Sequence, residues 1–372
     1  MKKYLLGWAA LVMGAAMMTS CSNDDNDDAP VIEYYSNGAY VVNSGNQRSN
    51  IDGSVTFINY STNAASQKMF YNANGRNLGG TVNDGLVYGS KVYIVSTAEN
   101  TVEVVDKKTF RSIKQIKMTD LLGDAEGKSP RHIVSGMGCV FVSTYGGYVA
   151  AIDTASYTLT KKYQVGSYPE GMAGYRSHLV VANSDYGNGN GTLSDIDLLQ
   201  GTVTTKKIEG VVNPTKVFFS SDGRLYVLDN GSYDANWNQI GAAMRLISFD
   251  SGTSLNLINC TMACFANNNT KIYYVNAPYG AKETQYGAYS LADNQKVEWE
   301  PSEKPAFPNE IASDPVEGGI YILSYVKGDG NYADYSANGY VVEYNSQGTK
   351  TNQYATGVGP TAMFFDTGYV VK

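Results

Sequence analysis

The chain repeats a segment of two short strands, and this repeat constrains the fold more than any other feature. Residues 91–106, KVYIVSTAENTVEVVD, alternate aliphatic with smaller or polar side chains around a polar break at Thr97–Asn100. Alternation with period two is typical of half-buried strands, so the segment predicts two antiparallel strands and a tight turn. Related copies follow at residues 140–153, 225–250, 272–293 and 320–345. The chain is therefore analysed first as a repeat architecture.

The spacing of the copies fits propeller blades of four strands each. The repeats recur roughly every 38 to 53 residues, which is the range of such blades, and second strands are expected near Tyr40, Val92, Val140, Leu179, Leu225, Ile272, Ile320 and Tyr369. A second marker is a short polar residue expected to end the third strand, at Asn59, Asp106, Asp153, Asp197, Asp250, Asp293 and Asn345. Such side chains bond the backbone of the next turn, so they are interpreted as turn residues and not as catalytic acids or calcium ligands. The sequence thus predicts an all-β chain with seven four-stranded blades.

Proline marks the start of the first strand in many repeats. It stands at Pro130, Pro169, Pro214, Pro308 and Pro360, where it costs no ladder hydrogen bond on an innermost strand. The last copy, residues 360–372, has no third or fourth strand after it. We therefore expect it to complete the first blade and close the ring, which removes open sheet edges. The partner of Tyr369–Val371 stays open at this point.

Composition excludes some functional classes. The 372 residues include 39 Gly and 30 Tyr, which suits short strands and tight turns, and the formal net charge is −7. An acidic chain without a basic cluster argues against nucleic-acid binding. Only two His, His132 and His178, argue against a His-based metal site or a Ser-His-Asp triad. The three later cysteines are interpreted as small buried residues: Cys139, Cys260 and Cys264.

The N-terminus is predicted to be a targeting segment. Residues 1–20 carry Lys2 and Lys3 before a short apolar run, and small residues precede Cys21. This resembles the lipobox of bacterial lipoproteins, which implies an acylated Cys21 anchored in outer-membrane lipid; an ordinary secretory signal is the alternative. The acidic run 22–28 resembles a surface-export tag, which implies display on the extracellular face of the outer membrane. The expected organisation is a signal peptide at 1–20, a linker at 21–30 and a propeller at 31–372.

Long loops between second and third strands are the candidate binding surface. They are expected at residues 185–191, 233–243, 279–287 and 326–338 and carry Tyr186, Tyr233, Trp237, Tyr279, Tyr286, Tyr332 and Tyr335. Aromatic rings on Gly- and Asn-rich loops are typical of binding surfaces, although some could only pack the loops onto the blades. The same face should receive polar residues beside the proline markers: Arg131, Glu170, Lys216, Asn309 and Glu310. These could bond a polar ligand or pair with one another.

The proline-led entry followed by runs such as LYVLDN and LVVANS resembles the YVTN-type β-propeller repeat over nearly everything after Tyr40. With the export signal and the Tyr-rich loops, the chain is similar to the BtuG-type cobalamin-binding surface lipoproteins. This resemblance implies a protein that binds a corrinoid on the loop face and passes it to a TonB-dependent transporter. It implies no catalytic cofactor, because cobalamin is then the transported ligand.

Three other functional classes stay open from sequence. Tyr and Trp rings would suit glycan or ferric-siderophore capture equally well. A lactonase-like or polysaccharide-cleaving propeller would need a metal cluster or an acid and base pair, and no GxSxG, P-loop, CxxC or DxDxDG-like motif selects one. A structural surface-layer or protein-interaction propeller would also fit uneven loops.

Overall fold

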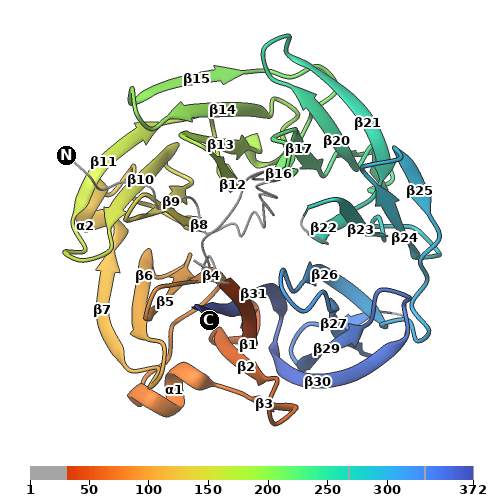
Figure 1. Ribbon diagram of the computed structural model, residues 1–372, viewed down its shortest axis with the longest axis horizontal. Helices are drawn as coiled ribbons and strands as arrows, with labels where there is room; N and C mark the ends of the chain where they lie inside the picture. Colours follow the sequence, from red (N-terminus) through yellow and green to blue (C-terminus); the bar gives the residue numbers. More distant parts are fainter. Residues whose placement is uncertain (1–31, 267–268, 331, 372) are drawn as a thin grey trace, which may run out of the picture.

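The protein folds into a β-propeller-like ring of seven sheets (Figure 1). The computed structural model describes residues 32–266, 269–330 and 332–371. The predicted signal segment, Cys21 and the acidic linker lie outside the described residues. In the described chain the helical elements are short and lie in loops: α1 (Met69–Asn74), α2 (Met118–Leu122), and the 3-10 turns η1 (Gln47–Ser49) and η2 (Asp185–Gly187). None of the helices described is long and apolar enough to cross a membrane.

Each sheet is antiparallel and runs outward from the centre. From the innermost strand, sheet 1 contains β31 (Pro360–Val371), β1 (Ile32–Asn43), β2 (Ser54–Asn59) and β3 (Ala64–Ser66). Sheet 2 contains β4 (Val82–Tyr88), β5 (Lys91–Ser96), β6 (Thr101–Asp106) and β7 (Ser112–Lys117). Sheet 3 contains β8 (Pro130–Gly136), β9 (Cys139–Thr144), β10 (Tyr148–Asp153) and β11 (Leu159–Gln164). Sheet 4 contains β12 (Pro169–Tyr175), β13 (His178–Asn183), β14 (Thr192–Asp197) and β15 (Thr202–Lys206).

The later sheets follow the same order, and two of them contain additional short strands. Sheet 5 contains β16 (Pro214–Phe219), β17 (Leu225–Asp229), β20 (Ala243–Ser248) and β21 (Thr253–Asn259), with a separate hairpin of β18 (Ser232–Tyr233) and β19 (Gln239–Ile240). Sheet 6 contains β22 (Met262–Ala266), β23 (Lys271–Asn276), β24 (Gln285–Ser290) and β25 (Gln295–Val297). Sheet 7 contains β26 (Phe307–Ser313), β27 (Ile320–Lys327), β29 (Asn338–Tyr344) and β30 (Lys350–Val358), and β28 (Ala333–Asp334) pairs with β27.

The repeated segment at residues 91–106 has the predicted structure. β5 and β6 pair in antiparallel register from Lys91 opposite Asp106 to Ser96 opposite Thr101. Their central residues are buried because neighbouring sheets cover both faces, and the ring core consists of such contacts between adjacent sheets. Burial on both faces explains why the aliphatic runs are nearly continuous.

The C-terminal strand closes the ring, as the sequence predicts. β31 is the innermost strand of sheet 1 and pairs with β1 along its whole length. The pairing that the sequence leaves open is Tyr369 with Tyr34 and Val371 with Ile32. Tyr369 therefore lies at the end of an innermost strand rather than in a second strand. Sheet 1 therefore joins both ends of the described chain, and its first two strands are held together across the point where the ring closes.

Most of the polar residues predicted to end third strands form turns there, but Asp250 and Asp293 lie beyond the ends of β20 and β24, because those strands stop earlier, at Ser248 and Ser290. The carboxylate of Asp106 accepts hydrogen bonds from the backbone N–H groups of Lys108 and Thr109 at 3.1 and 2.9 Å. Asp153 and Asp197 accept equivalent bonds in sheets 3 and 4. These bonds stabilise the ionised form and lower the pKa of each of the three carboxyls. These three carboxylates therefore stabilise the turns that follow the third strands.

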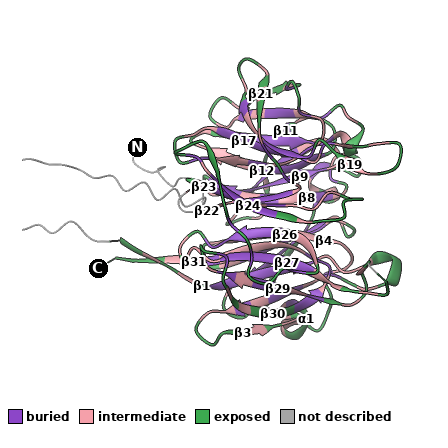
Figure 2. Ribbon diagram, turned by 90° about the vertical axis from the view of Figure 1, so that its right-hand side faces the viewer, coloured by how far each residue is buried: buried purple, intermediate pink, exposed green. Residues whose placement is uncertain are grey.

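The ring has two faces with different loops. Turns between second and third strands, and connections from one sheet to the next, lie on one side, which we call the loop face. On the opposite side β1 and β31 extend beyond the ring as a two-stranded ribbon, so we call it the stem face. Figure 2 shows the ribbon on the left and the β18–β19 hairpin on the right. The described chain therefore begins on the face opposite the long aromatic loops.

Candidate ligand-binding face

Three aromatic clusters stand on the loop face. The first contains Tyr145, Tyr168 and Tyr186, whose ring centroids lie 5.0 to 6.0 Å apart. Tyr186 belongs to the predicted loop of sheet 4, whereas Tyr145 and Tyr168 lie in short connections that the sequence analysis did not select. No sequence signal distinguishes those two, because their proximity depends on the packing of sheet 3 against sheet 4. The structure thus places a predicted residue within a larger aromatic cluster.

The second cluster contains Tyr233, Trp237 and Tyr279. The Tyr233 centroid lies 6.4 Å from that of Trp237 and 6.5 Å from that of Tyr279. The predicted loop of sheet 5 is a hairpin, and its turn is fixed by Asp234, which accepts backbone hydrogen bonds from Asn236 and Asn238.

A second set of bonds fastens this hairpin to the neighbouring loop of sheet 6. The Gln239 backbone N–H donates to the Tyr279 carbonyl at 2.9 Å, and the Tyr279 N–H donates to the Gln239 side chain at 3.3 Å. Two loops far apart in sequence therefore hold their aromatic rings in one place.

The third cluster lies on sheet 7. Tyr335 contacts Tyr325 edge-on with centroids 4.9 Å apart, and Tyr332 is 77% exposed on the same loop. Asp334 fixes the turn by accepting from the backbone of Ser336 and Ala337. The Asn46 side chain donates to the Tyr335 carbonyl at 2.9 Å, which ties this loop to sheet 1.

Six of the seven predicted loop aromatics are exposed, and Tyr286 is not. Trp237 is 72% exposed and Tyr186 68% exposed, whereas Tyr286 is only 8% exposed. β24 begins at Gln285, so Tyr286 lies within the strand and packs into the core between sheets 6 and 7. The expectation that Tyr286 belongs to the exposed loop is corrected accordingly, because side chains alternate between faces once the strand begins.

Arg131 and Glu170 form a partly buried ion pair at the mouth of the central channel. Nε of Arg131 lies 2.9 Å from a Glu170 carboxylate oxygen, and its Nη1 donates to the Asn83 side chain at 2.9 Å. The guanidinium carbon also lies 4.8 Å from the centre of the Tyr145 ring, whose hydroxyl donates to Glu170. These contacts join the innermost strands of sheets 2, 3 and 4, and they place the first aromatic cluster directly beside the channel mouth.

His132 extends the same network. Its Nδ1 lies 3.0 Å from the Asp84 carboxylate, and its Nε2 lies 3.5 Å from Glu170. Burial alone would lower the pKa of His132, but its hydrogen bonds to Asp84 and Glu170 outweigh burial and raise the pKa. Burial likewise opposes ionisation of Glu170, yet His132 and Arg131 hold the pKa of its carboxyl below the ordinary value. The group therefore combines a guanidinium, an imidazole and two carboxyl side chains in mutual contact. We call Arg131, His132, Glu170 and Asp84 the channel-mouth network.

The other predicted mouth residues are also engaged. Lys216 forms an ion pair with Glu310, which joins the innermost strands of sheets 5 and 7. The Asn309 side chain donates to the Pro360 carbonyl at 2.8 Å, which joins sheet 7 to sheet 1. Four of the five predicted mouth residues therefore pair with one another, and the fifth, Asn309, bonds the backbone of sheet 1; that they also bond a ligand stays a prediction.

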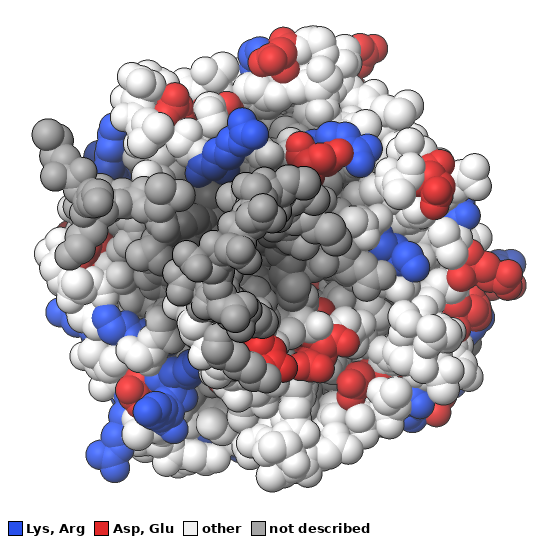
Figure 3. Space-filling view, viewed as in Figure 1, with Lys and Arg blue, Asp and Glu red and all other residues white. Residues whose placement is uncertain are grey.

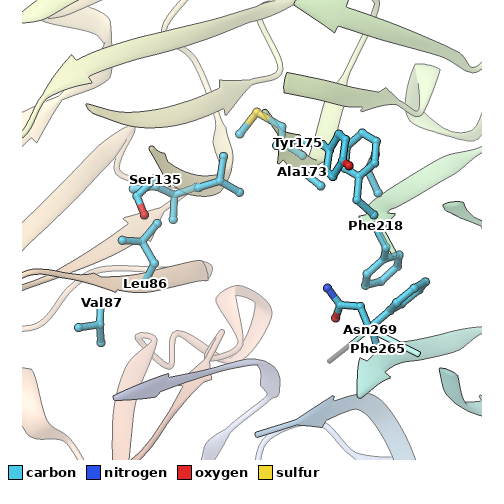
Figure 4. A pocket seen from close by; sticks show the side chains of 14 residues that line it. Leu86, Val87, Ser135, Ala173, Tyr175, Phe218, Phe265 and Asn269 are labelled. Atoms are coloured by element: carbon cyan, nitrogen blue, oxygen red, sulfur yellow. The ribbon is translucent and has the colours of Figure 1, made fainter. Parts of the chain in front are cut away.

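The central channel changes character along its length. Near the loop face it has charged side chains, among them Asp84, His132, Lys216 and Glu310. Near the stem face it contains an apolar cavity of about 310 Å³, in which Leu86 lies across from Phe218 and Phe265 (Figure 4). The last two rings stack with centroids 5.0 Å apart. Within the channel, a polar ligand is therefore favoured at the loop-face end and not in the apolar cavity.

Among the surface charges, the potential metal ligands and the cysteines, one residue departs from its predicted burial: Cys139 is not fully buried. The stem face carries Lys and Arg mixed with Asp and Glu, without a large basic patch on the visible surface (Figure 3). Among the described residues, no group of three or more His, Cys, Asp or Glu side chains could hold a metal ion. Cys260 and Cys264 are buried and Cys139 is half-buried, and all three are free thiols.

Ring and sheet order define the chain as a β-propeller-like all-β protein. It belongs to the family described as "Domain of unknown function (DUF5074)", whose sequence profile matches residues 37–365.

Two solved structures that are similar to the chain share little sequence with it. One is hydrazine synthase from Kuenenia stuttgartiensis, with a TM-score of 0.56 and 14% identity over 78% of this chain and 95% of that chain. Another is the computationally designed Ika8 protein, with a TM-score of 0.48 and 12% identity over 87% and 82% of the two chains. No curated protein sequence matches. At this identity the hydrazine synthase likeness indicates the fold alone.

Proposed function

We propose that this protein is a seven-bladed propeller that captures a corrinoid on its loop face at the outer surface of a bacterium. The observation that carries the proposal is the set of exposed aromatic clusters around the polar channel mouth. A corrinoid is broad and flat with amide side chains, so it needs aromatic contact area together with amide and hydroxyl partners. Tyr and Trp supply that area at low entropic cost and keep their polar atoms available.

The loops that carry the clusters are ordered by their own hydrogen bonds. The second cluster is fixed by Asp234 and by the contacts between Gln239 and Tyr279. A surface that is already arranged pays less entropy on binding, which favours capture from dilute solution. The charged groups at the channel mouth pair internally, so the aromatic clusters are the main contact surface and Arg131 with Tyr145 forms its inner border.

The predicted lipid anchor supports the same role. β1 begins on the stem face, opposite the aromatic loops. A lipid attached to Cys21 would therefore leave the loop face free to face the solvent. A protein displayed in this way would hold its ligand without covalent chemistry and release it to a TonB-dependent transporter.

Isothermal titration separates the proposal from its alternatives. The full mature chain is titrated with cyanocobalamin, with a ferric siderophore and with a panel of soluble oligosaccharides. Saturable binding of cyanocobalamin at micromolar protein is expected, together with a rise in melting temperature that follows ligand concentration. No binding of cyanocobalamin at that concentration, or binding of another ligand in its place, would contradict the proposal.

A further inference from the structure

A second pocket lies at the seam where the ring closes, on the opposite side from the aromatic clusters. It measures about 770 Å³ and is bounded by sheets 1 and 7. Its walls come from β2, the turn at residues 60–63, β27, β29 and β30, and Ser36 on β1 also lines it. That turn joins a third to a fourth strand, so the pocket opens toward the stem face. Its volume lies within the range of about 300–1,000 Å³ common for small-molecule sites.

The lining is polar, and its only charged groups are carboxylates. It consists of four Asn, two Ser, three Tyr, Phe57 and the carboxylates Glu317 and Glu343, and none of these described lining residues is Lys, Arg or His. Glu343 is half-buried in β29 at the centre of a hydrogen-bond network. The number of hydrogen-bond donors in that network that reach the Glu343 carboxylate determines what a ligand could supply.

On one side of Glu343 the available hydrogens point away from it. Tyr60 donates its hydroxyl hydrogen to Asp314 at 2.9 Å. Tyr321 lies 2.9 Å from the Tyr60 hydroxyl and 3.3 Å from Glu343 Oε1. A tyrosine carries one hydrogen, and Tyr60 has already used its own, so the shorter contact requires the hydrogen of Tyr321. Tyr321 then has no hydrogen left to donate to Glu343.

The other side has the same pattern. Tyr354 donates to the Asn63 side-chain oxygen in a close contact, and it lies 3.2 Å from Glu343 Oε2. Asn63 donates to Asn352 at 2.8 Å, and Asn352 donates to Glu343 Oε2 at 2.8 Å. Within this described network one N–H group therefore reaches a carboxylate that can accept several hydrogen bonds.

We infer that this seam pocket binds a neutral polyhydroxylated ligand, of the class of a sugar residue in a glycoside. Glu343 would accept hydrogen bonds from ligand hydroxyls, because the described protein groups around it donate only one. The Asn side chains around it carry N–H groups that can donate, and the Tyr and Ser oxygens can accept, which together match the hydroxyls of a sugar. An ammonium or guanidinium ligand would satisfy the carboxylates but offer no acceptor to the Asn N–H groups. Phe57 provides an apolar wall for the C–H surface of a sugar ring.

The experiment uses saturation-transfer NMR and calorimetry on the full mature chain with methyl glycosides of glucose, galactose, mannose and N-acetylglucosamine. At least one is expected to bind saturably. Glu343→Gln retains the size of the side chain but replaces an acceptor with a donor, and it should weaken binding at least about tenfold. Ser61→Trp places a large ring at an exposed rim position and should abolish binding without touching the core.

Matched measurements keep this inference separate from the proposed function. A Trp237→Ala/Tyr279→Ala variant should bind the glycoside unchanged, and Glu343→Gln should bind cyanocobalamin unchanged. Thermal melting shows whether each variant is folded. The inference is overturned if no glycoside of the panel binds at millimolar concentration, or if both pocket variants bind normally. It is also overturned if spermine or arginine methyl ester, in place of the glycosides, binds with the same sensitivity to the variants.

Discussion

The loop face contains two regions that use their side chains in opposite ways. At the channel mouth, Arg131, His132 and Glu170 lie close to the axis and pair with one another across two neighbouring sheets. Farther out, Trp237 and Tyr279 are exposed on loops whose backbone is already held in place. Position in the ring explains the difference: innermost strands converge and bring charges into contact, whereas longer loops carry their rings outward. The charged side chains near the axis therefore stabilise the ring, and the exposed aromatic side chains of the outer loops are available to bind a ligand.

The largest expected effect breaks the channel-mouth network. Glu170→Ala leaves the partly buried Arg131 cation and the His132 ring without their shared carboxylate, so we expect the free energy of unfolding to fall by about 3–5 kcal/mol. Urea denaturation measures it. Lys304→Ala is the matched control, because Lys304 forms a solvent-exposed ion pair with Glu300. This variant should lower the free energy of unfolding by less than about 1 kcal/mol. Equal losses for the two variants would contradict the comparison.

The second prediction concerns the rim. Trp237→Ala/Tyr279→Ala removes two exposed rings and should weaken cyanocobalamin binding by at least about 30-fold, or about 2 kcal/mol. Calorimetry measures the affinity, and the melting temperature should change little because neither ring is buried. Tyr369→Ala is the control, since Tyr369 is an exposed tyrosine on the stem face. If the double variant binds cyanocobalamin with unchanged affinity, the second cluster does not contribute to binding.

The third prediction is a pH dependence of stability. Because folding raises the pKa of His132 above its ordinary 6.5, the stabilisation it provides is complete below that pH and is lost as the pH rises through the folded-state pKa. Folding lowers the pKa of Glu170 below its ordinary 4.5, so the stabilisation from Glu170 is present above that pH and is lost as the pH falls through the folded-state pKa. The network should therefore stabilise the fold most between about pH 4.5 and 6.5.

Urea denaturation of the parent protein and of His132→Asn at pH 5.5 and at pH 9 tests this dependence. The difference in unfolding free energy between the two proteins should be larger at pH 5.5. A difference that grows toward pH 9 would mean that His132 is neutral in the fold.

The smallest expected effect comes from the hairpin of sheet 5. β17 and β20 pair from Leu225 opposite Ile247 to Asp229 opposite Ala243, although the hairpin is inserted between them. Replacing residues 232–240 with a short Asn-Gly turn should change the unfolding free energy by less than about 1 kcal/mol, since loop length costs little. Thermal or urea denaturation of this variant measures the change. Ligand affinity should nevertheless fall, because the second cluster loses Tyr233 and Trp237. A large loss of stability would show that the hairpin belongs to the scaffold.

The sequence predicted the scaffold well because its signals are local. Alternating residues, prolines at Pro130 and Pro169, and turn residues such as Asp106 each determine a strand or its end without distant contacts. Ring closure followed from counting strands in the last copy, and the pairing of β31 with β1 confirmed it.

The candidate site was only partly predictable because it depends on contacts between sheets. Tyr145 and Tyr168 lie in short turns, and only the packing of neighbouring sheets brings them to Tyr186. Tyr286 was assigned to a loop, but a strand that starts one residue earlier turns its ring into the core. A shift of one residue reverses the face of every side chain in a strand, so loop boundaries decide which aromatics are exposed.

Hydrogen–deuterium exchange of the full mature chain, with and without saturating cyanocobalamin, tests the central claim most directly. The account predicts slower exchange at residues 230–242, 277–284 and 328–337 on the loop face, and unchanged exchange in the turns of the stem face. Protection confined to the stem face, or no protection at a concentration that saturates binding, would contradict it.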